Sequence, residues 1–182
     1  KHEMELGSPS HLPNVLVILV DTLRYDMLNT DIMPASMKLK EDTSTWAFER
    51  HYSGGNATRT GVFNLFYGLP GTYWNAFSSN QVSPVMMDAF LSNNYEMQIH
   101  AAAPLTKPAF DRTIFSRVDN IVLKTEGETS WQKDANITDR WLKFIEHRQN
   151  TNEQQSPFFG LLFYDGAHGF SVPEKVKHRF EP

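Results

Sequence analysis

A continuous apolar run near the start of the chain is the feature that most limits its possible folds. Residues 14–20 read Asn-Val-Leu-Val-Ile-Leu-Val and lead directly into Asp21. A run rich in β-branched residues and without polar alternation is typical of a strand buried on both faces, as in a parallel sheet. Residues 158–164 are a second apolar run, and a polar loop with Gly166 and His168 follows them.

Helical and strand patterns alternate between these two runs. The helix signals are apolar residues at helical spacing, and we predict helices over residues 34–41, 58–67, 84–91 and 131–147. The strand signals are short apolar segments, and we predict further strands over residues 46–52, 96–101 and 121–123. This alternation predicts an α/β domain with a mostly parallel sheet flanked by helices.

Composition excludes several classes of function. The chain has 182 residues, 40% of them hydrophobic, which favours a folded domain over a disordered one. It has no cysteine, so cysteine-based zinc sites and thiol catalysis are excluded. A net charge of −4 gives no reason to expect nucleic acid as a partner. No apolar run approaches the roughly 20 residues of a membrane span, and residues 1–12 are predicted to be a linker.

Asp21 is the first candidate site residue. In open α/β sheets, ligands bind beyond the carboxyl ends of the strands, and an aspartate there can coordinate a cation through oxygen. The alternative is that Asp21 caps the helical segment that follows. Arg24 and Asp26 have the spacing of a supporting ion pair with a structural role.

Thr58 is the second candidate, at the start of a predicted helix. The turn Ser-Gly-Gly-Asn before it lets the backbone approach a ligand, and a helix N-terminus favours an anion. A metal ion could activate the Thr58 hydroxyl as a nucleophile, and Arg59 could neutralise phosphoryl charge. The alternative is an ordinary turn in which Asn56 or Thr58 only caps the helix.

His168 is the third candidate. A histidine in a loop beyond a strand end can hydrogen-bond a phosphate or leaving-group oxygen, although such a residue is often merely exposed. The three candidates follow in order, each near the carboxyl end of a predicted strand or at the start of a helix.

These motifs resemble the sulfatase/alkaline phosphatase superfamily. Residues 14–26 are similar to the strand that delivers a metal-binding acid, residues 54–63 resemble the nucleophile motif, and the strand before His168 resembles the one that brings a substrate-side histidine. Residues 51–56 and 63–68 look most like the YejM family of bacterial inner-membrane proteins. The resemblance implies an alkaline phosphatase/sulfatase-like fold and makes residues 13–182 the N-terminal portion of a sulfatase-like domain.

Carried over by position, the resemblance makes Asp21 and Thr58 ligands of a divalent metal (Mg, Mn or Zn). It also makes Thr58 the nucleophile and His168 a substrate-binding residue. Arg59 is assigned to substrate binding from its charge and its position beside Thr58. Formylglycine sulfatases carry Cys or Ser at the nucleophile, followed by x-Pro-x-Arg, whereas Thr58 is followed by Arg-Thr-Gly. The later Asp-His pair of the superfamily does not occur in these residues. We therefore expect a truncated domain, an incomplete metal site and an isolated chain that is inactive.

The resemblance implies one function and leaves an alternative. It implies a periplasmic domain of an inner-membrane protein, linked through residues 1–12 to N-terminal membrane helices, that acts as a sensing or regulatory module in lipopolysaccharide and outer-membrane homeostasis. The implied partners are lipid A or cardiolipin headgroups and a regulatory protein. The alternative is an active metal-dependent phosphoester hydrolase or phosphotransferase that uses Thr58. If the domain is an enzyme, a phosphatase or transferase is favoured over a true sulfatase.

Overall fold

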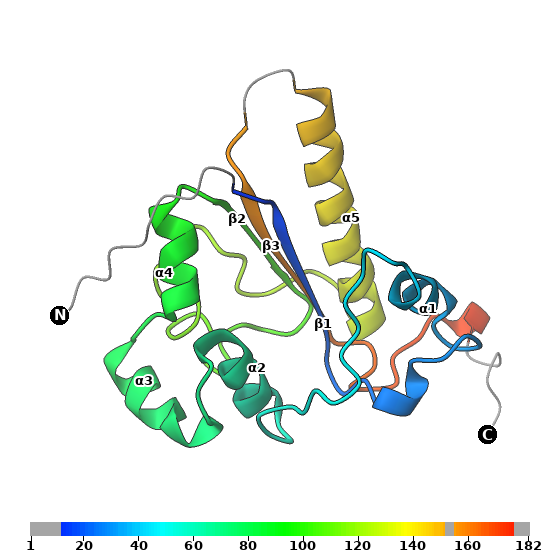
Figure 1. The fold of residues 1–182 in the computed structure, drawn as a ribbon, viewed down its shortest axis with the longest axis horizontal. Helices are drawn as coiled ribbons and strands as arrows, with labels where there is room; N and C mark the ends of the chain where they lie inside the picture. The colour runs from blue at the N-terminus through cyan, green and yellow to red at the C-terminus, as the bar shows by residue number, and fades with distance from the viewer. Residues whose placement is uncertain (1–11, 152–154, 177–182) are drawn as a thin grey trace.

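The computed structural model describes residues 12–151 and 155–176, in which strands alternate with helices (Figure 1). The strands are β1 (Val15–Val20), β2 (Glu96–Ala101) and β3 (Phe158–Tyr164). The helices are α1 (Pro34–Lys40), α2 (Thr58–Tyr67), α3 (Trp74–Asn80), α4 (Val85–Ser92) and α5 (Ser130–Asn150). Short 3-10 helices lie at Tyr25–Met27, Gly71–Tyr73 and Glu174–Val176. The predicted linker falls outside the described residues except for Leu12.

The three strands form one parallel sheet in the order β1-β3-β2. Val15 pairs with Phe159 and Glu96 with Phe158, so all three strands end at the same edge of the sheet. The last strand in the chain therefore lies between the first two, and long helical connections join them. The predicted α/β fold with a parallel sheet flanked by helices is confirmed.

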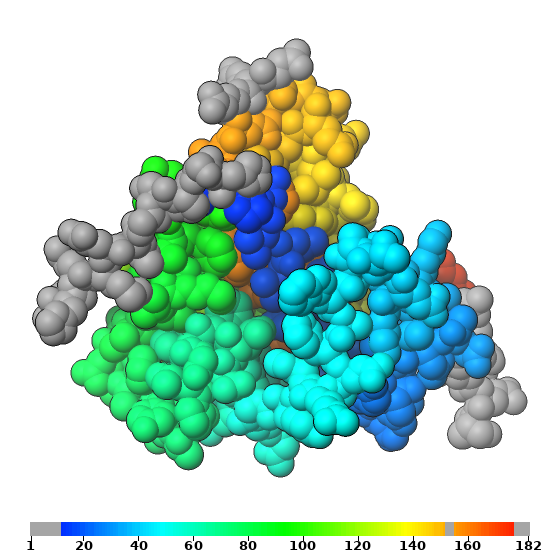
Figure 2. Space-filling view, in the orientation of Figure 1, coloured from blue at the N-terminus to red at the C-terminus, as the bar shows by residue number. Residues whose placement is uncertain are grey.

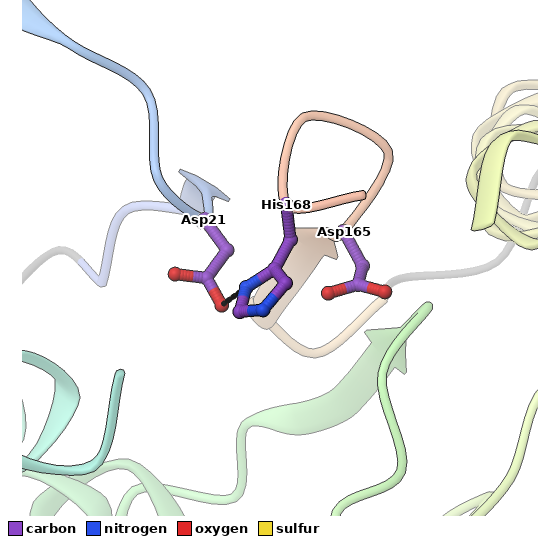
Figure 3. A group of neighbouring side chains, drawn as sticks. All are labelled: Asp21, Asp165 and His168. Carbon is purple, nitrogen blue, oxygen red and sulfur yellow. Dashed lines mark ion pairs between the residues drawn. The ribbon is translucent and has the colours of Figure 1, made fainter. Parts of the chain in front are cut away.

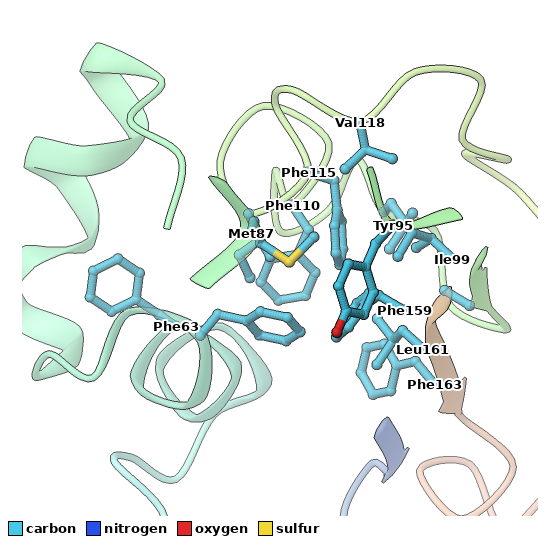
Figure 4. Packing of buried hydrophobic residues seen from close by; sticks show 14 of the residues in the cluster. Phe63, Met87, Tyr95, Ile99, Phe110, Phe115, Val118, Phe159, Leu161 and Phe163 are labelled. Carbon is cyan, nitrogen blue, oxygen red and sulfur yellow. The ribbon is translucent and has the colours of Figure 1, made fainter. Parts of the chain in front are cut away.

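Strand β3 is buried on both faces and joins two apolar clusters. On one face, Phe159, Leu161 and Phe163 pack against a core that includes Phe63 of α2 and Met87 of α4 (Figure 4). On the other face, Phe158 and Leu162 pack against Trp141 of α5. Gly160 makes room for this helix, because a Cβ there would lie 2.6 Å from the Trp141 ring. Strand β3 is thus covered by helices on both faces.

Helix α5 is the longest of the described helices, and its boundaries follow from local chemistry. Thr129 caps it: the Thr129 hydroxyl accepts from the Gln132 amide, and the Gln132 side chain accepts from the Thr129 amide. Ile137 and Trp141 lie buried on the face that meets the sheet. No described helix is both long enough and apolar enough to cross a membrane.

Two strand predictions are wrong. Residues 46–52 form no strand and are exposed, because no described segment pairs with their backbone groups. Residues 121–123 form no strand either. A hydrogen bond from the Leu105 amide to the Leu123 carbonyl joins them to an earlier loop of the same chain. Helix α3 was not predicted.

Strand β1 is also less covered than its sequence predicts. Leu16 and Ile18 are 41% and 57% exposed, whereas β1 was predicted to be buried on both faces. Strand β1 is an edge strand of the described sheet, and helix α5 packs on β2 and β3. The face of β1 that carries Leu16 and Ile18 therefore has no described helix over it.

Candidate metal and anion site

Two strand ends and one helix start meet at the carboxyl edge of the sheet. Asp21 follows β1, His168 lies in the loop after β3, and Thr58 is the first residue of α2. These three side chains line a single cavity of about 670 Å³. The geometry therefore brings together the predicted residues Asp21, Thr58 and His168.

Asp21 is the centre of the cluster. Its side chain is 14% exposed, and its Oδ2 accepts a hydrogen bond of 2.8 Å from the Thr58 hydroxyl. Its Oδ1 accepts from the Thr22 amide at 2.9 Å. The helical turn that follows has Arg24 as its N-cap residue, so Asp21 is not a helix cap. Its carboxylate is instead directed toward the pocket.

The backbone after Asp21 turns in a strained conformation. Thr22 has φ = +58°, a region that β-branched residues rarely occupy. Such a residue costs about 1–3 kcal/mol and persists only where the surrounding structure enforces it, often at functional sites. The turn takes the chain away from the sheet immediately after the Asp21 side chain has entered the pocket.

Thr58 reaches Asp21 because of the turn that precedes α2. Gly55 packs so closely against Thr60 that a Cβ at this position would overlap the Thr60 side chain. The N-cap residue is Ala57, which has no capping group, and the Thr58 hydroxyl donates to Asp21 across 37 positions. The cap-only interpretation of Thr58 is therefore wrong. The positive end of the α2 dipole lies at this same position.

The loop after β3 contributes an imidazole and a second carboxylate. His168 Nδ1 lies 3.4 Å from Asp21 Oδ2, and the His168 ring lies between the carboxylates of Asp21 and Asp165 (Figure 3). Ligand atoms of these three residues lie within 4.8 Å of one another. Asp165 was not predicted as a site residue, although it follows an apolar strand just as Asp21 does.

Helix α5 holds this loop in place. The two Asp134 carboxylate oxygens accept from the amides of Asp165 and Gly166 at 2.9 and 2.8 Å. The Ser130 hydroxyl donates to Asp165 Oδ2 at 2.8 Å. Sequence reasoning missed Asp134 and Ser130 because they lie more than 30 positions before the loop, in the first turns of a helix.

Three other predicted residues, Arg59, Arg24 and Asp26, lie away from the cavity. The Arg59 guanidinium sits 5.8 Å from the ring centroid of Trp74, and Arg59 is not among the residues that line the cavity. Binding of substrate by Arg59 remains a prediction, and the position of its side chain does not favour it. Arg24 and Asp26 form the predicted ion pair, with Nη2 and Oδ2 at 2.5 Å, and the Arg24 hydrogen bond lowers the pKa of Asp26.

Comparison with known proteins identifies the family of the chain. The family model described as Sulfatase matches residues 13–182. The chain belongs to the sulfatase family. It is 28% identical over 162 residues to an uncharacterized protein of Haemophilus influenzae, covering 89% of this chain. It is 26% identical over 168 residues to the inner membrane protein YejM of Salmonella typhimurium, covering 92% of this chain. The chain spans 26% of the length of each of these relatives.

Sulfatase-family domains are typically metal-dependent, and the residues present fit a divalent ion. Carboxylate oxygens suit Mg²⁺ and Mn²⁺, and a carboxylate–imidazole set also suits Zn²⁺. Asp21, Asp165 and His168 could form a partial metal site, with the Thr58 hydroxyl bonded to one of its members.

Proposed function

We propose that this chain is the phosphate-recognising part of a sulfatase-like domain that senses lipopolysaccharide at the periplasmic face of a bacterial inner membrane. The grouping of Asp21, Asp165 and His168, two of which line a solvent-open cavity, carries the proposal. The similarity to YejM of Salmonella typhimurium, an inner membrane protein by its name, supports the membrane context.

In this proposal the site binds a phosphorylated headgroup through a divalent ion. Asp21, Asp165 and His168 would hold Mg²⁺, Mn²⁺ or Zn²⁺, which when bound supplies positive charge for phosphate oxygens. The N-terminus of α2 favours the same anion. Lipid A and cardiolipin headgroups both present phosphate of this kind. The signal would pass to a regulatory protein partner, and the inner membrane would be reached through segments outside this chain.

One observation favours binding over turnover. None of the described residues that line the cavity is a lysine or arginine, and Arg59 is turned toward Trp74. Phosphoryl transfer relies on fixed positive charge around the transferring group. A bound divalent ion could hold a phosphate here, but the described lining residues supply no cationic side chain to stabilise the charge that shifts during transfer.

The second candidate is phosphoester hydrolysis or transfer, and the Thr58–Asp21 hydrogen bond favours it. Thr58 Oγ1 would form a bond to phosphorus while its proton passes to Asp21 Oδ2, 2.8 Å away. The ester P–O bond would break, and the leaving alcohol oxygen would take a proton from His168 or water. Water or an acceptor alcohol would then remove the phosphoryl group from Thr58.

Calorimetry on the full-length gene product tests the first candidate. Mn²⁺-dependent binding of a phosphorylated headgroup is expected for the native protein and is expected to be lost in Asp21→Asn. Asp26→Asn is the matched control, because Asp26 is an exposed carboxylate five positions later and outside the cavity. Unchanged headgroup binding in Asp21→Asn would refute the proposal.

Thr58 variants separate the two candidates. If the domain senses, Thr58→Ala keeps headgroup binding and envelope integrity in cells. If it catalyses, Thr58→Ala abolishes release of phosphate from a phosphomonoester while leaving metal binding in place. Phosphatase activity that survives in Thr58→Ala removes the nucleophile role from this residue.

A further inference from the structure

A second hollow in the molecule runs along β2, at the opposite edge of the sheet from β1. Its volume is about 810 Å³, which is within the usual range for sites that bind small molecules. Figure 2 shows the blue atoms of β1 at the surface, and β3 separates that strand from β2. The described residues that line this hollow include none of those that line the cavity at Asp21. The hollow is therefore separate from the candidate metal site.

The described lining of this hollow comes from three parts of the chain. Helix α5 contributes Arg140, Lys143 and His147, β2 contributes residues 97–100, and a loop contributes residues 117–122. The three α5 side chains follow at spacings of three and four positions, which places them on one face of the helix. We call this hollow the α5–β2 groove.

The α5–β2 groove carries an excess of positive charge. Arg140 and Lys143 are both exposed, and neither forms an ion pair or a hydrogen bond with any described residue. The third cation, Arg117, is already paired with Asp88 at 2.9 Å. Asp119 is the only acidic residue among the described residues of the lining. Two cations of the groove thus lack an acidic partner within the part of the chain that the structure describes.

The charge of Arg140 acts on the strand and is not directed only toward solvent. The pKa of His100 on β2 is lowered by burial and, to a smaller extent, by the positive charge of Arg140. An effect of this kind requires the two groups to lie near each other. The His100 ring also packs edge-on against Trp141, the next residue on α5, with 6.4 Å between ring centroids. Arg140 therefore lies beside the strand that contributes to the groove.

Apolar side chains provide much of the remaining lining. They come from all three parts of the chain: Met97 and Ile99 of β2, Val118 and Ile121 of the loop, and Phe144 of α5. Met97, Ile121 and Phe144 are only partly buried, so a ligand could cover their remaining exposed surface. Small-molecule sites typically combine an apolar lining with a few polar or charged groups that fix the orientation of the ligand.

We propose that the α5–β2 groove binds a small anion with an apolar body, an aryl or alkyl carboxylate or phosphate. The anionic group would pair with Arg140 and Lys143, and the apolar body would lie against Met97 and Phe144. An acidic peptide fits less well, because only two cations lack an acidic partner and Asp119 would repel further carboxylates. This site does not depend on a divalent ion at Asp21 or on the function proposed above.

Calorimetric titration of the full-length gene product tests the proposal, with a chelator present to keep divalent ions from the candidate metal site. The probes are 4-phenylbutyrate and 4-phenylbutylphosphonate, which share an apolar body and differ in the anionic group. The phosphonate contains no ester bond that a phosphoesterase could cleave. Three comparison compounds complete the series: 4-phenylbutan-1-ol lacks the charge, acetate lacks the apolar body, and a glutamate peptide represents the acidic polymer.

The decisive variant is the double substitution Arg140→Gln and Lys143→Gln. Both side chains are exposed, so folding should be preserved, and the melting temperature checks this. The matched control is Lys124→Gln with Lys133→Gln, which removes the same charge from residues outside the described lining, one of them on α5. We expect one or both anionic probes to bind the native protein and the control equally, and to bind the decisive variant about ten-fold more weakly or less.

The comparison compounds and a photolabel give the remaining readouts. The alcohol and acetate should bind at least about ten-fold more weakly than the better anionic probe. A diazirine derivative of that probe should label residues 97–100, 117–122 or 140–147 of the native protein. Failure of both anionic probes to bind, equal affinity in the two double variants, equal binding of the alcohol, tighter binding of the glutamate peptide, or labelling confined to other segments would each overturn the proposal.

Discussion

Asp21 accepts two hydrogen bonds, one from the amide of its neighbour Thr22 and one from the hydroxyl of the distant Thr58 on α2. These bonds orient the carboxylate and connect β1 to the first turn of α2. Because Asp21 is 14% exposed, a lost partner would be only partly replaced by water. The side chain that would hold an ion is thus already positioned by the protein itself.

Removing the Thr58 hydroxyl should therefore reduce stability. Thr58→Val deletes the bond to Asp21 and is expected to lower the free energy of unfolding by about 1–2 kcal/mol. Thr58→Ser keeps a hydroxyl at the same position and should lie closer to the native value. Urea denaturation measures both; equal losses for valine and serine would show that the hydrogen bond is not the cause.

His100 predicts a pH dependence of stability. Its Nε2 lies 3.2 Å from Gln98 Oε1, and its buried Nδ1 has no partner among the described residues. Burial, with a smaller contribution from Arg140, lowers the pKa of His100. The unfolded chain therefore takes up this proton at higher pH than the folded chain, so stability is fully present above about pH 6.5 and falls as the pH drops below it.

Thermal unfolding between about pH 7 and about pH 5 measures this dependence. The melting temperature is expected to fall with decreasing pH in the native protein, and the fall should be smaller in His100→Gln. His147→Gln is the control, because His147 is exposed on α5 and should leave the slope unchanged. A slope that is identical in His100→Gln would exclude His100 as its source.

Individual site residues were predictable to different degrees. Asp21 was predictable because the end of an apolar strand fixes where its next residue lies, and Asp165 carries the same signal. Arg59 was not, because successive helical residues point about 100° apart and its direction depends on Trp74, which packs from another helix. Sequence gives the position of a residue on an element more readily than the direction of its side chain.

At the level of elements, helix α5 acts on the site through Asp134. Asp134 accepts from two successive amides of the loop that carries Asp165 and His168, and a Cβ at Gly166 would lie 2.5 Å from its Oδ2. The loop is thereby tied to a helix that packs on β2 and β3. Asp134 is a positioning residue, since it touches the loop backbone and not the cavity.

Asp134→Ala should loosen this loop without disrupting α5. Loss of both acceptors is expected to cost roughly 1–3 kcal/mol of folding stability. Metal affinity should fall, because Asp165 and His168 would no longer be held beside Asp21. Asp139→Ala is the control on an exposed face of the same helix. Calorimetric titration with Mn²⁺ and denaturation are the measurements, and unchanged metal affinity would contradict the positioning role.

Elements whose signals are local were predicted well, and those that need a distant partner were not. The apolar face of α5 and the run in β3 are complete within their own segments, and both are observed. Residues 46–52 have a strand pattern, but a strand also requires a neighbour for its backbone groups, and no described segment provides one. The exposure of β1 was unpredictable for the same reason, since neighbouring elements determine burial.

At the scale of the whole molecule, β3 contributes side chains to both apolar clusters, one on each of its faces. Phe159, Leu161 and Phe163 belong to the cluster with α2 and α4, and Phe158 and Leu162 belong to the cluster with α5. Disrupting β3 therefore exposes both clusters, so the sheet and the helices on its two faces should unfold together. Residues 21–57 contribute to neither cluster and are not subject to this coupling.

Amide hydrogen exchange should reveal this division. Amides of β3 are expected to exchange only through global unfolding, because opening them requires loss of both clusters. Amides of α1 and of residues 41–57 should exchange through local opening at much lower free energy, since no buried residue there must be exposed. The contrary result in the 182-residue chain is protection of α1 amides as strong as that of β3 amides. That result would show that residues 21–57 have stabilising contacts outside the two clusters, and it would contradict their separate unfolding.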